Sequence, residues 1–354
     1  MNSNPVNLID LQPKNIIVRM PNWLGDLVMS TPILHDLRSK WPEAKITVVC
    51  QNVLSVIVQE DPNINEVVTF KTSKKQKRES IKEYLSLLRK GNYDLGILLT
   101  NSFSTAWLFW RGHVQTRVGF AANWRSFLLN HAIPFPLEIK NQHLVKTYKE
   151  LLVPFGISIS SSSPQLYVTE QERKEAQESL KQWGISKSDI LIGVNPGAAY
   201  GSAKCWLPER FKELTDILLK HPKVKVLYFG DKAGQSLVDM ICEGMPERVI
   251  NLAGKTHLRQ LLALIQACHL FLTNDSGPMH VASALNVPLI ALFGSTSDIA
   301  TSPYKGGLVI HKHVKCSPCY RRECPIDFRC MKEISVEEVY QKIKNWMNDN
   351  ELIE

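Results

Sequence analysis

Short apolar segments alternate with helical patterns along nearly the whole chain, and this alternation restricts the fold more than any other feature. The apolar runs expected to form strands are residues 16–19, 46–50, 67–70 and 95–99 in the first half, and 190–194, 224–229, 270–273 and 289–293 in the second. Runs of this length, separated by amphipathic stretches, indicate βαβ units around buried parallel sheets. We therefore predict an α/β protein.

A serine-rich segment divides this alternation into two parts. Residues 157–164 contain five serines and one proline, a composition typical of a linker. A chain of 354 residues is long enough to form two separate cores. We predict one domain over residues 1–160, a second over 165–334, and a C-terminal helical segment over 335–354.

Composition and charge exclude some classes of protein and favour others. No apolar stretch approaches the roughly 18–20 residues of a membrane helix, and the N-terminus lacks the features of a secretory signal, so we expect a cytoplasmic protein. The net charge of +8 favours an anionic partner. Its densest part includes Lys74 and Lys75. This run is expected to be either a solvated loop or a contact with an anionic membrane face.

A carboxylate follows the first predicted strand closely. Asn22, Trp23, Gly25 and Asp26 lie between that strand and a helical pattern, at the carboxyl edge where open α/β sheets bind ligands. Gly25 would let the backbone turn, and Asp26 could act as a base toward an incoming hydroxyl. The alternative is that Asp26 only caps the next helix. Pro32 predicts a kink, or a new helix capped by Thr31.

The second half has two small-residue turns that suit an anion. The first runs from Asn195 to Lys204 after a strand, where backbone N–H groups and one cation can meet a diphosphate. The second, from Asn274 to His280, opens a helix whose free N–H groups favour phosphate. An ordinary capped helix start remains the alternative there. The residues expected to bind the donor are Gly25, Asn195, Gly197, Ala198, Ser202, Lys204, Asn274, Asp275, Ser276, Gly277 and His280.

Other chemistry is less well supported by the sequence. The motifs of P-loop proteins, dinucleotide oxidoreductases and zinc peptidases are absent. Four cysteines follow a C-x2-C-x4-C-x5-C pattern, which is a weak zinc candidate because only one C-x2-C pair is present. Reduced packed thiols or a labile disulfide are the alternatives. These cysteines are Cys316, Cys319, Cys324 and Cys330.

Aromatic and basic residues also mix between Trp107 and Arg125, as they do on nucleic-acid surfaces. No nucleic-acid-binding module surrounds them, so we expect core aromatics and a wall for the acceptor instead. The residues expected on the acceptor side are Asn22, Trp23, Lys74, Lys75, Arg117 and Arg125.

Residues 19–30, 195–206 and 274–285, together with the cysteine segment, resemble the lipopolysaccharide heptosyltransferases of glycosyltransferase family 9, particularly the type II enzymes. The strings Pro-Asn-Trp-Leu-Gly-Asp and Asn-Asp-Ser-Gly-Pro-Met-His-Val-Ala carry the resemblance, which covers nearly the whole chain. It implies a GT-B architecture, with two Rossmann-like domains facing across a cleft and a final helix that packs back on the first domain.

The resemblance also implies a reaction. Heptose would move from ADP-heptose to the first heptose of heptosyl-Kdo2-lipid A, at the cytoplasmic face of the inner membrane and without a required cofactor. Asp26 would be the base, Lys204 would neutralise the departing diphosphate, and Asp275, Ser276 and Gly277 would hold the donor. The chain departs from the type II pattern at Cys205, where relatives commonly have an arginine.

Three other functions remain as alternatives. The first is a type I heptosyltransferase or another sugar transferase of this family. The second is a nucleotide-sugar epimerase of GT-B fold. The third is a non-catalytic protein that binds nucleotides or nucleic acid. It is the least favoured of the three, because the basic residues are dispersed and two acidic groups, Asp26 and Asp275, stand at predicted ligand positions.

Overall fold

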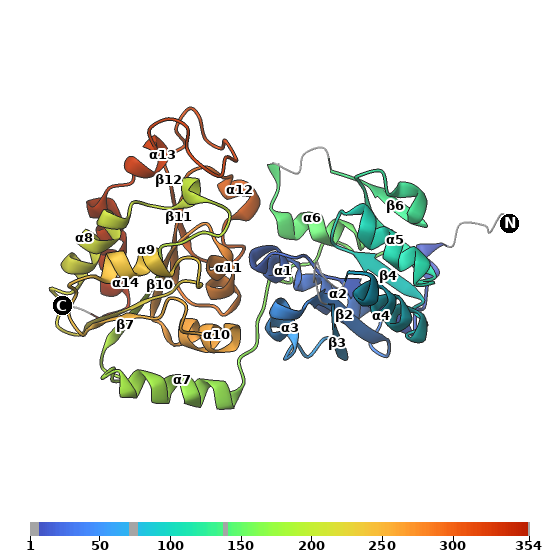
Figure 1. Cartoon of the computed structure of the whole chain (residues 1–354), viewed down its shortest axis with the longest axis horizontal. Helices are drawn as coiled ribbons and strands as arrows, with labels where there is room; N and C mark the ends of the chain where they lie inside the picture. The colour runs from blue at the N-terminus through green and yellow to red at the C-terminus, as the bar shows by residue number, and fades with distance from the viewer. Residues whose placement is uncertain (1–6, 71–76, 137–140, 353–354) are drawn as a thin grey trace. The chain divides into compact units, whose positions relative to one another are not determined.

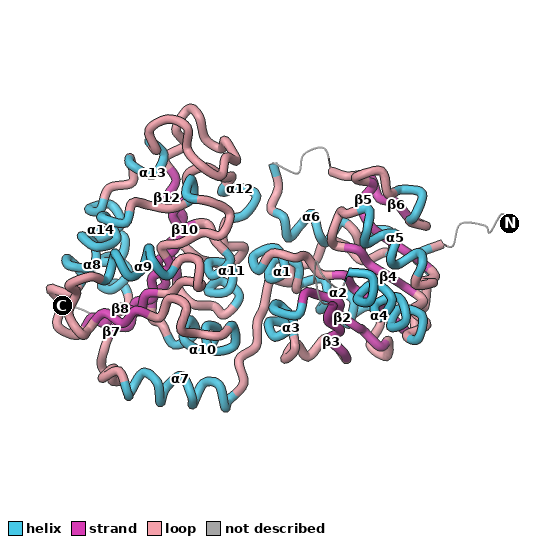
Figure 2. Tube along the Cα trace, in the orientation of Figure 1, coloured by secondary structure: helices cyan, strands magenta, loops and turns pink. Residues whose placement is uncertain are grey.

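Each half of the chain forms one six-stranded parallel sheet covered by helices (Figures 1 and 2). The structure, a computed structural model, describes residues 7–70, 77–136 and 141–352. The chain divides into two compact units, Met1–Tyr167 and Val168–Glu354. The predicted α/β class is therefore confirmed. Across the described residues, no helix has the length and apolar character needed to cross a bilayer.

In unit 1 the strand order is β3-β2-β1-β4-β5-β6. The strands are β1 (Asn15–Arg19), β2 (Lys45–Gln51), β3 (Glu66–Phe70), β4 (Leu95–Leu98), β5 (Thr116–Ala121) and β6 (His131–Pro134). The helices are α1 (Leu24–Ser30), α2 (Pro32–Lys40), α3 (Asn52–Val58), α4 (Lys77–Lys90), α5 (Phe103–Arg111) and α6 (Leu144–Glu150). The chain leaves β1 first toward β2 and later toward β4, so the strand order reverses between β1 and β4.

Unit 2 repeats this topology with the order β12-β11-β10-β7-β8-β9. Its strands are β7 (Ile190–Asn195), β8 (Val224–Tyr228), β9 (Val249–Asn251), β10 (Leu270–Asn274), β11 (Leu289–Phe293) and β12 (Leu308–His311). Its helices are α7 (Glu170–Gln182), α8 (Pro208–Leu218), α9 (Gln235–Cys242), α10 (Leu258–Ala267), α11 (Gly277–Ala284), α12 (Asp298–Thr301), α13 (Arg329–Lys332) and α14 (Val336–Asp349). Here the order reverses between β7 and β10.

Proline divides the first helical region as the sequence predicts. Helix α1 ends at Ser30, and α2 begins at Pro32 with Thr31 in the N-cap position. Because proline has no backbone N–H and a fixed φ, it fits the first helical position, where that donor would have no partner within the helix. The predicted break is confirmed.

The serine-rich segment differs from the predicted linker. Lys149, whose side chain is 1% exposed, donates to the backbone and side-chain oxygens of Ser160 and Ser162 over 2.6–2.9 Å. Both serine hydroxyls also donate to the buried carboxylate of Asp36. The segment is therefore fixed within unit 1, and the boundary between the units falls later, between Tyr167 and Val168. Sequence composition could not reveal this buried ammonium–carboxylate centre.

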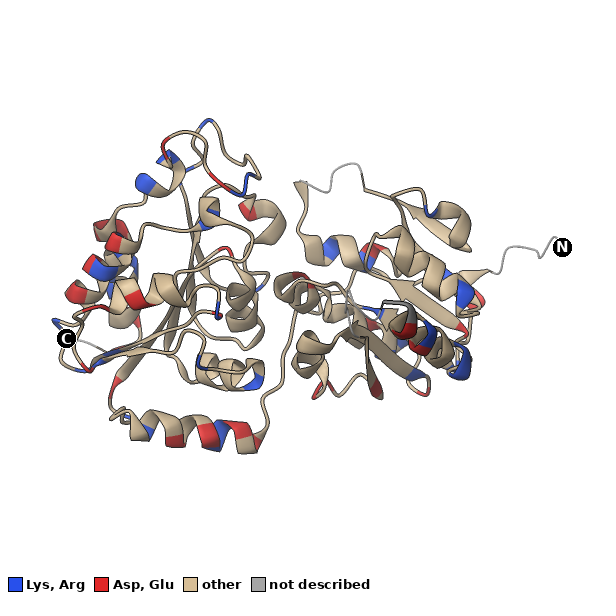
Figure 3. Cartoon of the chain, in the orientation of Figure 1, with Lys and Arg blue, Asp and Glu red and all other residues tan. Residues whose placement is uncertain are grey.

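The C-terminal helix contributes to the core of unit 2. Val339, Ile343 and Met347 of α14 are fully buried in the core of unit 2, in one cluster with Phe211 and Leu218 of α8. The apolar face of this helix is therefore covered within unit 2, and its packing back on the first domain stays a prediction. Its other face, like that of α7, carries charged residues along its length (Figure 3).

Candidate active site

The best-defined polar site lies in unit 2, where the strand order reverses. Strands β7 and β10 are parallel neighbours, with Asn195 paired to Thr273 at their carboxyl ends. Loops leaving two such strands run to opposite faces of the sheet and open a crevice between them, which is where α/β sheets bind ligands. Both predicted donor-binding turns begin at this point.

Two buried asparagines hold the turns together. Asn274 donates from Nδ2 to the carbonyl of Pro196 at 2.6 Å and accepts from the backbone N–H of Trp206 at 3.0 Å. Asn195 donates from Nδ2 to Ser276 Oγ at 3.2 Å. These bonds run from each loop to the other, so the two turns form one rigid frame. Asn195 and Asn274 therefore act as positioning residues.

An ion pair lies within this frame. Lys204 Nζ is 2.5 Å from Asp275 Oδ2, and the two side chains are 13% and 4% exposed. Thr296, from the loop after β11, donates to the same carboxylate oxygen at 2.6 Å. An ammonium has three donors, and Asp275 accepts from one of them. The pair thus fixes the direction of Lys204, whose ammonium also lies 5.0 Å from the centre of the Tyr200 ring.

The remaining predicted donor residues surround the pair. Ser276 is the N-cap of α11, and its hydroxyl bonds Thr273 and Asn195 instead of capping the helix. Gly277 begins α11, whose N-terminus favours an anion. His280 is buried in the same helix. Gly197 and Ala198 are half-buried in the loop after β7, and Ser202 is exposed.

In unit 1 the predicted base lies near the carboxyl end of β1. Asp26 is the third residue of α1, and the N-cap is Trp23, so the alternative that Asp26 caps the helix is wrong. Gly25 also lies inside the first turn of α1, so the change of chain direction between β1 and α1 comes before Gly25. The pKa of Tyr148 in α6 is raised by burial and, secondarily, by the charge of Asp26. Helices α1 and α6 are also in contact with each other.

The residues before α1 are held by a buried arginine. Arg19 is 3% exposed, lies over the Phe70 ring at 4.5 Å, and donates to Asn22 Oδ1 at 2.6 Å. Burial lowers the pKa of Arg19. Asn22 and Trp23 are both exposed at the edge of the sheet. They remain available for the predicted contact with an acceptor.

The structure corrects two predicted acceptor residues. Arg117 lies near the amino end of β5, at the opposite edge of the sheet, where it donates to the carbonyls of Val114, Gln115 and Leu128. Arg125 is at the expected edge but fully buried, and it donates to the carbonyls of Thr100 and Phe120 and to Asn101 Oδ1. Burial lowers the pKa of Arg125 to about 10. Both side chains therefore stabilise loops. Lys74 and Lys75 lie outside the described residues.

The four C-terminal cysteines are unpaired thiols. Cys330 is buried, and its pKa is raised first by that burial and also by Cys316, Cys324 and Cys319. Among the described residues, one group of side chains has potential metal-binding atoms within 4.8 Å of one another, and none of these four cysteines belongs to it. Zinc binding by these thiols stays a prediction.

Sequence reasoning missed Thr296. It lies in Gly294-Ser295-Thr296-Ser297, a third small-residue loop at the carboxyl end of a strand. The rule that identified the other two turns, a run of small residues directly after an apolar strand, would also have found this loop. Its contact with Asp275 could not be deduced, because it depends on β11 lying beside β10.

Comparison with known proteins agrees with this geometry. Residues 83–328 match the family model described as Glycosyltransferase family 9 (heptosyltransferase). The chain is 28% identical to lipooligosaccharide heptosyltransferase 2 of Campylobacter jejuni, over 95% of this chain and 99% of that protein. It is 31% identical to lipopolysaccharide heptosyltransferase 2 of Escherichia coli, over 81% and 85%.

Solved structures give the same result for the fold. The structure of Escherichia coli ADP-heptose LPS heptosyltransferase II superimposes with a TM-score of 0.82 and 27% identity, covering 95% of this chain and 99% of that one. The predicted fold class, an α/β protein of the GT-B type built from two Rossmann-like units, is thereby confirmed.

Proposed function

The chain belongs to glycosyltransferase family 9, the heptosyltransferase family, and from this premise we propose that it transfers L-glycero-D-manno-heptose from ADP-heptose to the first heptose of the lipopolysaccharide inner core. The acceptor is heptosyl-Kdo2-lipid A, which the enzyme meets as a peripheral protein at the cytoplasmic face of the inner membrane. Relatives named heptosyltransferase 2, matched over most of their length, support this choice of reaction.

The observation that carries the proposal is the frame around Lys204 in unit 2. When the bond between the anomeric carbon and the diphosphate breaks, negative charge grows on the leaving ADP. An ammonium fixed in direction by Asp275 and Thr296 stabilises that charge without having to reorient during the reaction. The N-terminus of α11 adds backbone N–H groups beside it. This scheme uses no metal ion in the chemical step.

Asp26 supplies the other half of the reaction. Its carboxylate takes the proton of the acceptor hydroxyl as that oxygen attacks the anomeric carbon from the face opposite ADP. The new glycosidic bond forms as the bond to diphosphate breaks, so the configuration inverts. Excluding water from the reacting anomeric carbon would prevent hydrolysis of the donor.

The test uses defined truncated lipopolysaccharides and ADP-heptose, with products read by mass spectrometry. We expect a gain of one heptose on the mono-heptosylated acceptor alone, and ADP release that depends on both substrates. Heptose transfer to Kdo2-lipid A instead would indicate a type I enzyme. Conversion of the donor sugar without any acceptor would indicate an epimerase.

A further inference from the structure

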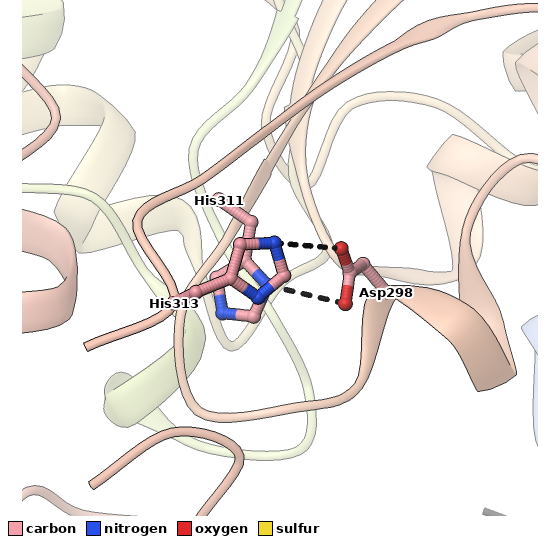
Figure 4. Close-up of side chains that lie close together, drawn as sticks. All are labelled: Asp298, His311 and His313. Carbon is pink, nitrogen blue, oxygen red and sulfur yellow. Dashed lines mark ion pairs between the residues drawn. The ribbon is translucent and has the colours of Figure 1, made fainter. Parts of the chain in front are cut away.

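Three side chains with metal-binding atoms meet at the end of β12 (Figure 4). They lie beside the frame formed by the two predicted donor-binding turns, residues 195–204 and 274–280, which we call the donor frame. They are Asp298, the first residue of α12, His311, the last residue of β12, and His313 just beyond it. We propose that these three residues bind a divalent transition-metal ion of the zinc class. This site is separate from the proposed donor-binding residues, and the inference does not depend on the proposed reaction.

The spacing of the three side chains fits a metal ion. His311 Nδ1 lies 3.2 Å from Asp298 Oδ1, and His313 Nε2 lies 3.3 Å from Asp298 Oδ2. One donor atom from each residue lies within 4.8 Å of the others. Zinc bonds of about 2.0–2.1 Å in tetrahedral geometry separate neighbouring ligand atoms by about 3.3 Å. Two imidazoles and one carboxylate are also a common ligand set for zinc and iron(II).

The hydrogen bonds of His311 orient a lone pair toward the carboxylate. Ser317 Oγ donates its only proton to the carbonyl of Gly294, so at 2.9 Å it can only accept from His311 Nε2. The neutral ring then has its lone pair on Nδ1, facing Asp298. Nδ1 is buried and finds no hydrogen-bond partner among the described residues. A lone pair facing a carboxylate is repulsive, whereas a cation between them makes both groups ligands.

The two imidazole rings lie close together at the site. The side chain of His311 is only 2% exposed, and the ring centres of His311 and His313 lie 4.0 Å apart. A metal ion needs both rings neutral. A histidine that binds a metal ion through one ring nitrogen usually donates a hydrogen bond from the other, as His311 Nε2 does to Ser317.

A metal ion at this site would fix the loop after β11, which contributes Thr296 to the donor frame. Asp298 follows two residues after Thr296, whose hydroxyl holds Asp275. The neighbouring Ser295 carbonyl accepts from the backbone N–H of Tyr320 at 2.7 Å. A metal ion on Asp298, His311 and His313 would join the start of α12 to the segment after β12. Since His313 is 67% exposed, water can complete the coordination.

Metal binding is tested by titrating the chelator-treated full chain with Zn²⁺, and with Co²⁺ as a spectroscopic probe. We expect one site whose cobalt spectrum has visible d–d bands without thiolate charge-transfer absorption. His313→Ala should weaken binding by more than about 100-fold, because the loss of a direct ligand exceeds the 10–100-fold effect of losing a residue that only hydrogen-bonds to a ligand. Because the side chain of His313 is 67% exposed, its removal should leave the fold intact, and circular dichroism of the variant checks this.

Two controls separate this site from the others. His35→Ala removes a histidine that is also exposed and 3.4 Å from a carboxylate, and it should leave binding unchanged. Cys316→Ser combined with Cys319→Ser removes two thiols and should leave the histidine site intact. Zinc binding that survives His313→Ala but disappears in the double cysteine variant would overturn the proposal. A wild-type chain that takes up no Zn²⁺ would also overturn it.

Discussion

Asp26 gains its proposed role from its place in the first turn of α1, near the carboxyl end of β1. Replacing it by asparagine keeps the shape but removes the base, so kcat should fall by about 10²–10⁴-fold. The dissociation constant for ADP should not change, because the donor frame is in unit 2. Glu79→Gln is the matched control, since Glu79 is an exposed carboxylate in the first turn of α4. Near-normal turnover in Asp26→Asn would remove Asp26 from the mechanism.

Lys204 and Asp275 should behave as one functional group. Lys204→Ala removes the cation that meets the leaving diphosphate, and we expect kcat/KM to fall by about 10²–10³-fold. Asp275→Asn leaves the ammonium without its 2.5 Å partner, and the double variant should lose less than the sum of the two single losses. Steady-state kinetics of the four proteins measure this coupling, with the exposed Lys255→Ala as control. Strict additivity would show that the pair has no shared role.

At the scale of elements, α7 and α10 are joined by Glu172 and Arg259, whose bidentate contacts are 2.5 and 2.6 Å long. The hydrogen bonds from Arg259 are the largest effect and lower the pKa of Glu172 to about 2, although burial acts in the opposite direction. A depressed folded-state pKa means that this stability is present above about pH 4.5 and is lost as the pH falls toward 2.

The variant Glu172→Gln should therefore lower the free energy of unfolding of unit 2 more at pH 7 than at pH 3. The difference should be at most about 3 kcal/mol, the value that corresponds to this pKa shift. Urea denaturation at the two pH values measures it. Glu175→Gln, an exposed position on the same helix, should show no such dependence on pH. An equal loss at both pH values would mean that the pair contributes through packing alone.

The elements that could be predicted from the sequence are those whose own residues specify them. Strands such as β1 and β10 are built around short apolar runs, Ile16–Val18 and Leu270–Leu272, and a buried parallel sheet requires that pattern. Strand β5 was missed because it contains Arg117 and Gly119, and β12 because it ends in a histidine. Long-range contacts decide these cases. The partners of Arg117 come from the segments on either side of the strand, and those of His311 come from α12 and the segment after β12.

The same limit applied to the candidate site. Small-residue turns after apolar strands could identify Asn195, Lys204 and Asp275, because the rule needs only local sequence. The ion pair itself needed the strand order, which places β7 beside β10 although β8 and β9 lie between them in sequence. The assignments of Arg117 and Arg125 failed for a related reason. An arginine in the sequence indicates a cation that could bind an anion. Only the fold shows that its N–H groups already donate to backbone carbonyls.

For the whole molecule, two separate cores predict two unfolding transitions. Val18 is fully buried in unit 1 and Ile343 in unit 2, so Val18→Ala and Ile343→Ala should each lower a different transition and thereby assign it. Calorimetry of the full chain measures both transitions. A single transition that both variants shift equally would mean that the two units unfold as one.

Ligand linkage then locates the donor site. ADP at 100 times its dissociation constant should stabilise the unit that binds it by about 2.7 kcal/mol. Because Lys204, Asp275 and the start of α11 all belong to unit 2, only the transition lowered by Ile343→Ala should move. For a unit of this size the increase is about 2–4 °C per kcal/mol. Lys204→Ala should reduce the increase, whereas Asp26→Asn should preserve it. A rise confined to the unit 1 transition would place the nucleotide on the other sheet and reverse the proposed division of roles.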